Sequence, residues 1–251
     1  MKNNRFVFVA PMYNASKTLP RMLHSICGQS YSNWKLFLID DVSSENECRK
    51  VEAIIDSFED TLITCNEEIK INVCWNGKNG RGKQWEVSNV LYGVSMCEDD
   101  DIVCRIDADD WLTDLDALHI INYFYNELSC DTLWTSHRWS YTDKNISAPM
   151  PDTADPYSYP WVTSHLKTFR KHLLNNVNDV NFRGQDGEYI KRAGDQAIYL
   201  PALKNSKKRI YLPRVMYHYT IDEQNGAVYQ TDDAKFQKSE ADFIRARGYV
   251  K

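Results

Sequence analysis

Residues 102–110 read Ile-Val-Cys-Arg-Ile-Asp-Ala-Asp-Asp, so an apolar run leads directly into a cluster of carboxylates. The run is short and rich in β-formers, which predicts a buried strand ending at Ile106. Carboxylates crowded at a strand end repel one another, which raises their pKa values unless a cation is present. Mg²⁺ and Mn²⁺ suit such sites and keep substrate phosphate oxygens as further ligands. The stretch predicts a divalent-metal site at Asp107 and Asp109; the alternative is an acidic turn, with Asp110 capping the next helix.

The residues before this stretch alternate between short apolar runs and helical patterns. The expected strands are residues 5–10, 34–39, 69–74 and 102–106, and the expected helices are 16–29, 44–58 and 84–96. Strand-helix units in succession imply an α/β fold with a mainly parallel sheet and helices on both faces. Ligands of such sheets bind at the carboxyl ends of the strands, which is where the polar motifs of this sequence lie.

The pattern beyond residue 113 is less regular. We expect helices at 118–128, 164–175, 195–204 and 232–247, and strands at 132–141, 209–212 and 215–219. The Pro-rich residues 149–160 predict a loop or lid. Because neither an internal repeat nor a linker is visible, we expect one domain over residues 1–251 with an elaboration of the sheet in its second half.

The composition is that of a folded globular protein, with 43% hydrophobic and 26% charged residues in 251. No apolar stretch approaches the ~20 residues that a membrane-spanning helix needs, and residues 6–12 are too short for a signal peptide. We therefore expect a cytosolic protein without a transmembrane segment. Seven scattered cysteines without a C-x-x-C pair argue against a disulfide framework and against a zinc site.

The charges are divided unevenly along the chain. Residues 1–160 hold 14 Lys and Arg against 25 Asp and Glu, whereas residues 161–251 hold 16 against 10. One interpretation is a chance division of solvated faces. The other is that the C-terminal third meets a polyanion or a phosphate-bearing acceptor.

Four motifs occur in an order that resembles the N-terminal half of family 2 glycosyltransferases. They are Ala10-Pro-Met-Tyr-Asn14, Gln29-Ser-Tyr31, Leu38-Ile-Asp-Asp-Val-Ser-Ser44 and Arg105-Ile-Asp-Ala-Asp-Asp110. The resemblance implies the GT-A fold, a Rossmann-like mixed sheet, and an inverting mechanism. It divides the domain into a nucleotide-sugar-binding half at 1–112 and an acceptor-binding half with the C-terminal helix at 113–251. One departure is that Val87-Ser88-Asn89 stands nearest to the family's Ala-Arg-Asn.

The resemblance also assigns roles to individual residues of the donor site. Those implied to contact the nucleotide sugar, commonly a UDP-sugar, are Pro11, Tyr13, Asn14, Asp40 or Asp41, Lys78, Gly80, Arg81, Asp107 and Ala108. Asp109, together with Asp107, is implied to bind Mn²⁺ or Mg²⁺ bridging the diphosphate. His218 stands where many GT-A enzymes have a metal-ligating histidine; the alternative is a histidine packed between tyrosines.

The base that takes the acceptor proton is assigned to Asp195. Gly194-Asp195 stands where the family has a Glu-Asp pair, so the first acid of that pair is missing here. The alternative is that Asp195 caps the helix it begins, and Asp186 and Glu188 are then the other candidates for the base.

The acceptor is left open by the sequence. A saccharide is slightly preferred, and a hydroxymethylated base in phage DNA is the alternative, because the basic C-terminal third follows several aromatic residues. These aromatics are Trp134, Trp139, Tyr157, Tyr159 and Trp161. Two hypotheses from other classes are a nucleotidyltransferase and a non-catalytic sugar-nucleotide-binding protein. Against the nucleotidyltransferase, Pro11-Met-Tyr-Asn14 lacks the Gly-rich basic loop that such enzymes carry after the first strand.

Overall fold

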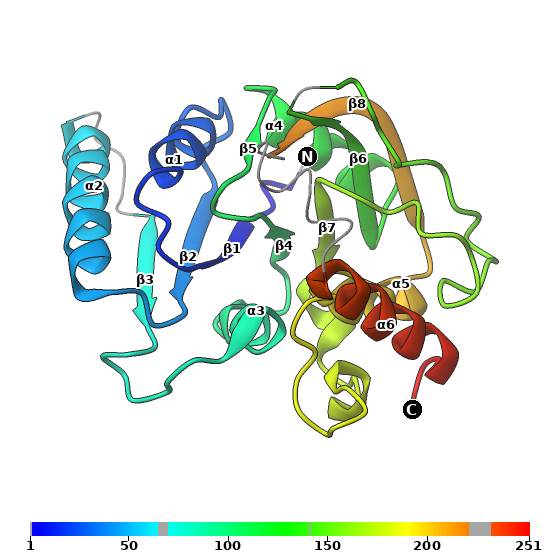
Figure 1. Cartoon of the computed structure of the whole chain (residues 1–251). Coiled ribbons are helices and arrows are strands. Elements are labelled where there is room, and N and C mark those ends of the chain that lie inside the picture. Colours follow the sequence, from blue (N-terminus) through cyan, green and yellow to red (C-terminus); the bar gives the residue numbers. More distant parts are fainter. Residues whose placement is uncertain (1, 65–69, 141, 221–231) are drawn as a thin grey trace.

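An eight-stranded sheet runs through the protein in the computed structural model, which describes residues 2–64, 70–140, 142–220 and 232–251 (Figure 1). Its strands are β1 (Phe6–Met12), β2 (Trp34–Asp40), β3 (Ile71–Trp75), β4 (Ile102–Arg105), β5 (Trp111–Leu112), β6 (Thr132–Trp139), β7 (Lys167–Arg170) and β8 (Arg209–Tyr219). Their order is β3-β2-β1-β4-β7-β6-β8-β5. Strands β1 to β4 are parallel, and β7 lies antiparallel between β4 and β6. The expected mixed, mainly parallel sheet is confirmed.

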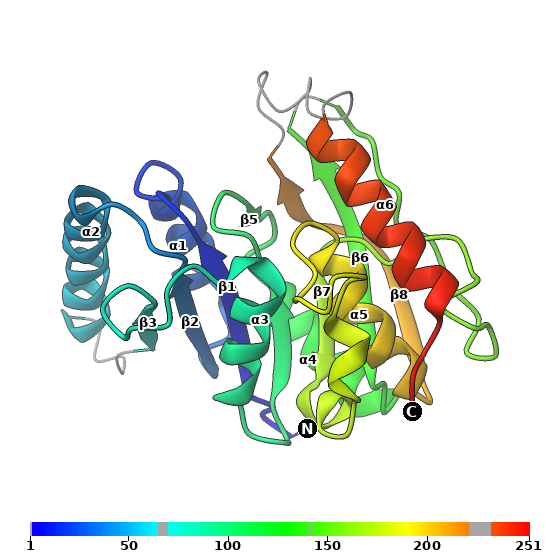
Figure 2. The ribbon, with the colours of Figure 1, turned by 60° about the horizontal axis from the view of Figure 1, so that its bottom comes forward.

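Helices cover both faces of this sheet (Figures 1 and 2). They are α1 (Leu19–Cys27), α2 (Glu45–Thr64), α3 (Trp85–Ser95), α4 (Ala117–Glu127), α5 (Gly194–Asn205) and α6 (Asp232–Arg247), with short 3₁₀ helices at Lys171–Leu174 and Asp179–Phe182. Side chains of a strand alternate between faces. Phe6 and Phe8 accordingly join the core with α1, α2 and α4, and Val7 and Val9 join the core with α3 and α5.

The contact between α3 and β1 is close because it is made through a glycine. A Cβ atom added to Gly93 would lie 2.4 Å from Cγ1 of Val9. The absence of a side chain at Gly93 therefore lets α3 lie against the strand that leads into the Pro11–Asn14 motif.

The second half of the chain differs from the sequence-based expectation in two places. Residues 164–175 were expected to be helical, yet Lys167–Arg170 form β7 and only Lys171–Leu174 turn into a 3₁₀ helix. The two expected strands at 209–212 and 215–219 are one strand, β8, whose register against β6 shifts between Leu212 and Val215. The shift surrounds Pro213, which cannot donate a ladder hydrogen bond.

Residues 149–160 have no helix or strand and are packed against the rest of the protein. Met150 and Tyr157 are buried in the core beneath α5. Arg245 of α6 donates to the carbonyls of Tyr157 at 3.0 Å and Tyr159 at 2.8 Å. The segment is thus a loop joined to the C-terminal helix. Among the described residues, none of the helices is sufficiently long and apolar to span a bilayer.

Candidate active site

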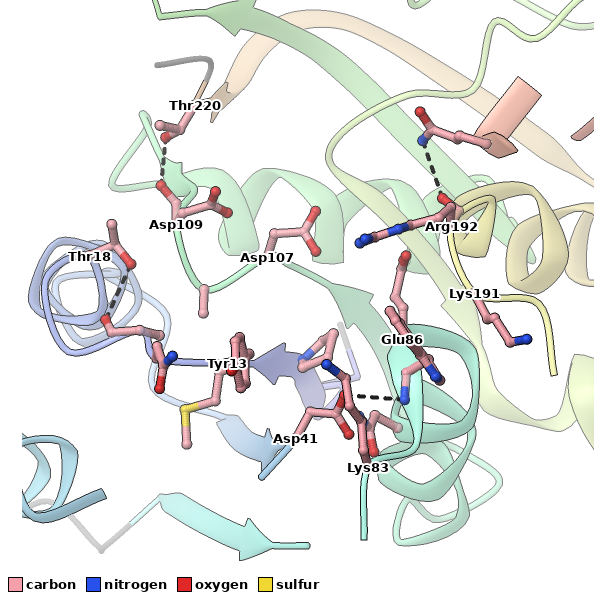
Figure 3. A pocket seen from close by; sticks show the side chains of 18 of the residues that line it. Tyr13, Thr18, Asp41, Lys83, Glu86, Asp107, Asp109, Lys191, Arg192 and Thr220 are labelled. Atoms are coloured by element: carbon pink, nitrogen blue, oxygen red, sulfur yellow. Dashed lines mark hydrogen bonds between the residues drawn. The ribbon is translucent and has the colours of Figure 1, made fainter. Parts of the chain in front are cut away.

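A cleft of about 750 Å³ opens at the carboxyl ends of β1 and β4. It is bordered by the turn after β1, the Asp107–Asp109 motif, the start of α3, the residues before α5 and the start of α6. In Figure 3, Glu86, Asp107 and Arg192 point toward one another from three different elements. The cleft thus lies where parallel sheets bind ligands, and it brings acidic and basic side chains together.

Asp107 and Asp109 both border the cleft, but they have different surroundings. Asp107 Oδ1 accepts from Arg105 Nη2 at 2.9 Å. In the described part of the chain, no side chain donates a hydrogen bond to the carboxylate of Asp109; Arg21 and Thr220 donate to its backbone carbonyl. Burial and the charge of Asp107 raise the pKa of Asp109 to about 6. A carboxylate that is costly to ionise and makes no ion pair with the described residues fits a site for a divalent metal ion.

Asp110 has a structural role. Its carboxylate accepts from the Tyr217 hydroxyl at 2.6 Å and from the Thr220 amide at 2.6 Å. Asp110 is buried, so both bonds lie inside the protein. They fasten the end of β8 to the acidic motif, and Asp110 does not cap the next helix, which begins at Ala117.

His218 lies in β8 with its ring stacked on Trp111 at a centroid distance of 3.6 Å. Its Nε2 atom is 3.2 Å from the Ser140 hydroxyl, and His218 does not border the cleft. Among the described residues, no group of three or more His, Cys, Asp or Glu side chains is arranged to hold a metal ion. Metal ligation by His218 therefore stays a prediction, and the geometry shown is that of a packed histidine.

The turn after β1 lies on the cleft as the sequence predicts. Pro11, Tyr13 and Asn14 all border it, and Tyr13 is 56% exposed. Asn14 has a φ of 49°, a left-handed conformation that asparagine tolerates better than most residues. Its amide donates to Ser43 Oγ at 2.7 Å, which fixes this turn to the residues after β2.

Asp40 and Asp41, which the sequence does not separate, take different positions. Asp40 Oδ2 accepts from the Ser43 amide at 3.0 Å and closes the turn after β2. Asp41 borders the cleft and accepts from the amides of Gln84 at 2.6 Å and Trp85 at 3.2 Å. Asp41 is therefore the acid of the two that lies at the cleft, and it also anchors the start of α3.

The Gly-rich loop contributes a different residue from those predicted. Lys78 pairs with Glu52, Arg81 donates to Asn76 Oδ1 at 2.7 Å, and neither residue borders the cleft. Gly80, with a φ of 72°, turns the loop outside it. Lys83 does border the cleft. The loop thus supplies a cation as expected, but from its last residues rather than its tip.

Asp195 lies in the first turn of α5 and does not cap this helix. Its carboxylate accepts from Lys167 Nζ at 2.9 Å and from Arg105 Nη1. Although burial opposes ionisation, the charges of Arg105 and Lys167 hold the pKa of Asp195 well below its usual range. Because Arg105 also binds Asp107, a single guanidinium connects Asp195 to the acidic motif.

The two alternative acids lie elsewhere. Asp186 pairs with Lys191 at 3.2 Å, and neither Asp186 nor Glu188 borders the cleft or the second cavity described next. Of the three predicted acids, Asp195 is thus the one that borders a cavity, and its role as the base stays a prediction.

A second cavity of about 450 Å³ adjoins the cleft. Asp195 and His165 border it, as do the aromatic side chains of Trp139 and Trp161. Tyr219, Ala234 and Gln237 border both cavities. Of the other aromatics considered from the sequence, Trp134 and Tyr157 are buried in the core. Asp195 thus borders a cavity lined partly by aromatic side chains, whereas Asp109 borders the cleft.

Several residues of the cleft were missed from the sequence. They are Lys83, Trp85, Glu86, Lys191, Arg192 and Thr220. Glu86 binds Arg105, and burial raises its pKa to about 7. Lys83, Trp85 and Glu86 follow the Gly-rich loop directly, which is a local signal. Lys191 and Arg192 come from a loop more than a hundred residues later in the sequence and reach the cleft only through the fold.

Comparison with known proteins gives a consistent picture. The sequence model described as Glycosyl transferase family 2 matches residues 7–176, which is more than half of the chain. The "UDP-Glc:alpha-D-GlcNAc-diphosphoundecaprenol beta-1,3-glucosyltransferase WfgD" of Escherichia coli is 41% identical over 49 residues, covering 20% of this chain and 19% of that protein.

Solved structures share the fold at low sequence identity. S. aureus TarS has a TM-score of 0.63 at 17% identity, covering 96% of this chain and 43% of that one. The mannosyltransferase PcManGT from Pyrobaculum calidifontis, in complex with GDP-Man and Mn²⁺, has a TM-score of 0.66 at 13% identity, covering 97% and 63%. This chain spans less than two thirds of the length of each of these three proteins.

Proposed function

The chain belongs to glycosyl transferase family 2, and we propose that it moves a sugar from a UDP-sugar to a hydroxyl group of a saccharide, with inversion at the anomeric carbon. The observation that carries this proposal is the pair of adjoining cavities. One contains the Asp107–Asp109 motif, and the other contains aromatic side chains and Asp195, which is joined to Asp107 through Arg105. This arrangement suits one cavity for the donor, the other for the acceptor and Asp195 for the base.

The larger cavity is proposed as the donor site. Its volume falls in the range of ~300–1,000 Å³ that is usual for small-molecule sites. We propose that Asp41, which borders it, contacts the base and that Tyr13 and Asn14 lie along the nucleoside. Lys83 and Arg192 are cations suited to the diphosphate. A uridine donor is supported by the name of the E. coli relative, which specifies UDP-Glc.

A divalent metal ion fits the acidic motif. We propose that Asp109 holds it together with Asp107, and that the donor diphosphate completes the ligand set, as is usual for Mg²⁺ and Mn²⁺. When bound, such an ion supplies positive charge that stabilises the departing nucleotide. His218 would have to leave its stack on Trp111 to join these ligands.

We propose that Asp195 takes the proton of the acceptor hydroxyl. As the acceptor oxygen forms its bond to the anomeric carbon, the bond from that carbon to the diphosphate oxygen breaks, and the nucleoside diphosphate leaves with the electron pair. Although burial opposes ionisation, the charges of Arg105 and Lys167 keep the Asp195 carboxylate ionised at neutral pH, so its oxygen atoms are free of a proton; the same charges lower its strength as a base. Lys167 and Arg105 fix its orientation.

A saccharide is proposed as the acceptor because of the composition of the second cavity. Trp139 and Trp161 offer flat apolar surfaces for a sugar ring beside Asp195. Lys238 and Arg245, the two cations among the described residues that border this cavity, both have partners within the protein. Lys238 pairs with Asp242 at 2.5 Å, and Arg245 donates to backbone carbonyls.

Four cations of the C-terminal third pair with acids from the first 160 residues. These pairs are Lys171–Asp99, Lys204–Asp155, Lys208–Asp152 and Arg214–Asp114. Each such pair lowers the net positive charge of this surface, and DNA binding depends on neutralising phosphates with positive charge. This pairing favours the saccharide over hydroxymethylated DNA.

A donor screen tests the proposal. The wild type and Asp109→Ala are incubated with a panel of nucleotide sugars and Mn²⁺, with and without EDTA, while release of nucleoside diphosphate is followed. We expect slow hydrolysis of one UDP-sugar, lost with EDTA and in the variant. No hydrolysis and no metal-dependent UDP binding would refute the donor and metal assignments.

Two further measurements separate the remaining hypotheses. Asp195→Asn should abolish transfer while leaving donor binding intact; unchanged turnover would remove Asp195 from the mechanism. Affinity for duplex DNA should be weak at all salt concentrations. Tight binding that falls steeply with salt would instead favour the DNA acceptor.

A further inference from the structure

The side chain of Glu86 lies directly against Gly194, although the two residues belong to different helices. Glu86 is the second residue of α3, and Gly194 is the first residue of α5. A Cβ atom added to Gly194 would lie 2.3 Å from Cδ and 2.3 Å from Oε1 of Glu86, closer than real Cβ atoms approach other atoms. Any side chain at position 194 would therefore displace the Glu86 carboxyl group.

The same carboxyl group holds Arg105. Glu86 Oε1 accepts from Nη2 of Arg105, whereas Asp195 Oδ1 accepts from Nη1. The Arg105 side chain is 5% exposed, so the guanidinium has little solvent to exchange with. Because the fork of a guanidinium is rigid, fixing one of its nitrogen atoms fixes the direction of the other. Glu86, together with Asp107, thus fixes the direction in which Arg105 presents its charge to Asp195.

The backbone at the start of α3 holds Glu86 in this position. Trp85 has a φ of 63°, a left-handed conformation that bulky residues seldom adopt. Such a conformation persists only where the surroundings enforce it. Here Asp41 accepts from the Trp85 amide at 3.2 Å, and Lys83 lies 4.5 Å from the centre of the Trp85 ring. The strained residue directly precedes Glu86, whose carboxylate pairs with Arg105 at the edge of the cleft.

We infer that Glu86 is a positioning residue for sugar transfer, which acts through Arg105 to fix the Asp195 carboxylate at the second cavity, and that Gly194 is needed to make room for it. This inference rests on the proposed function, because it assigns Asp195 to the transfer step. Glu86, on α3, thereby supplies the carboxyl group that is missing at position 194, on α5.

A double-mutant cycle tests the inference. The variants are Glu86→Gln, Glu86→Ala, Gly194→Ala and Glu86→Ala with Gly194→Ala, and Glu45→Gln on the exposed face of α2 is the matched control. The probe is the UDP-sugar that the donor screen identifies, and kcat, KM, donor affinity and Tm are measured for each protein.

We expect Glu86→Gln to lower kcat by about 100-fold, since misplacement by ~1 Å costs about that much. The KM for the donor and its affinity should stay within about 3-fold, because Glu86 acts through Arg105 rather than on the nucleotide. Gly194→Ala should lower kcat similarly by displacing Glu86. The double variant should be no worse than Glu86→Ala, because the methyl group then has room. Glu45→Gln should match the wild type.

Several outcomes would overturn the inference. Turnover of Glu86→Gln within about 3-fold of the wild type, or a fall in Tm with kcat unchanged, would leave Glu86 a structural residue only. Additive losses in the cycle would refute the link to Gly194. If Gly194→Ala does not fold, the two Glu86 variants still decide the positioning role. A wild type that turns over no donor would refute the proposed function itself, and the inference would fail with it.

Discussion

Replacing Lys167 by Met measures how much the buried charges beneath the two cavities stabilise the protein. The Lys167 side chain is 1% exposed, and its Nζ atom lies 2.9 Å from Asp195 Oδ1 and 3.1 Å from His165 Nδ1. Burial lowers the pKa of Lys167, against the attraction of Asp195. Met keeps most of the volume of the lysine stem but removes the charge. The substitution thus isolates the ion pair from the packing.

The expected loss follows from what Asp195 retains. Breaking a buried ion pair costs about 3–5 kcal/mol when the remaining charge is left without a partner. Asp195 keeps its contact with Arg105, so we expect the lower end, about 3 kcal/mol. In a chain of 251 residues this corresponds to a fall in Tm of about 6–12 °C.

Thermal melting at pH 7, followed by circular dichroism, is the assay. Lys235→Met is the matched control, because Lys235 makes a 3.0 Å pair with Asp232 while both side chains are at least 75% exposed. We expect that control to change stability by less than about 0.5 kcal/mol. If Lys167→Met melts within the range of the control, the buried pair does not stabilise the fold and the reasoning is wrong.

Three further substitutions test other contacts. Tyr217→Phe removes the hydroxyl group that donates to Asp110 at 2.6 Å, and leaving this buried acceptor unpaired should cost about 1–3 kcal/mol in urea denaturation; a loss near zero would contradict the tether. Burial lowers the pKa of His137 to about 4, below its ~6.5 in the unfolded chain. The unfolded chain therefore binds more protons than the folded one between these two pKa values. From pH 8 to pH 5.5 the free energy of unfolding of the wild type should fall by about 1.4 kcal/mol more than that of His137→Gln. Thermal melts of both proteins at the two pH values measure this difference. Gly93→Ala should cost about 1–3 kcal/mol by overpacking against Val9, measured by Tm, and Val9→Ala in the same chain should restore part of it.

The first half of the fold was predictable because its central strands, β1 and β4, are buried on both faces. Such strands appear in the sequence as continuous apolar runs, and Phe6–Met12 and Ile102–Arg105 were located to within a residue or two. The cleft motifs follow these strands directly. Their positions at the carboxyl edge of the sheet therefore followed from the order of strands and helices alone.

The second half resisted prediction because its features depend on distant partners. A buried lysine at the start of a strand is unfavourable by local rules, and β7 accommodates Lys167 because Asp195 comes to it from α5. The missing acid at Gly194 has the same explanation, since Glu86 comes from a helix some hundred residues earlier. Cations after residue 160 likewise form ion pairs with acids from the first 160 residues, as Lys171 does with Asp99.

The common wall of the two cavities has a thermodynamic consequence. Tyr219, Ala234 and Gln237 border both spaces, so a ligand that shifts any of them alters both sites at once. Linkage then requires that each substrate change the affinity of the other by the same factor. A nucleotide product that stayed in the cleft would likewise change the affinity of the empty second cavity for its ligand. A substitution at any of these three positions, on β8 and α6, should therefore change ligand affinity in both cavities.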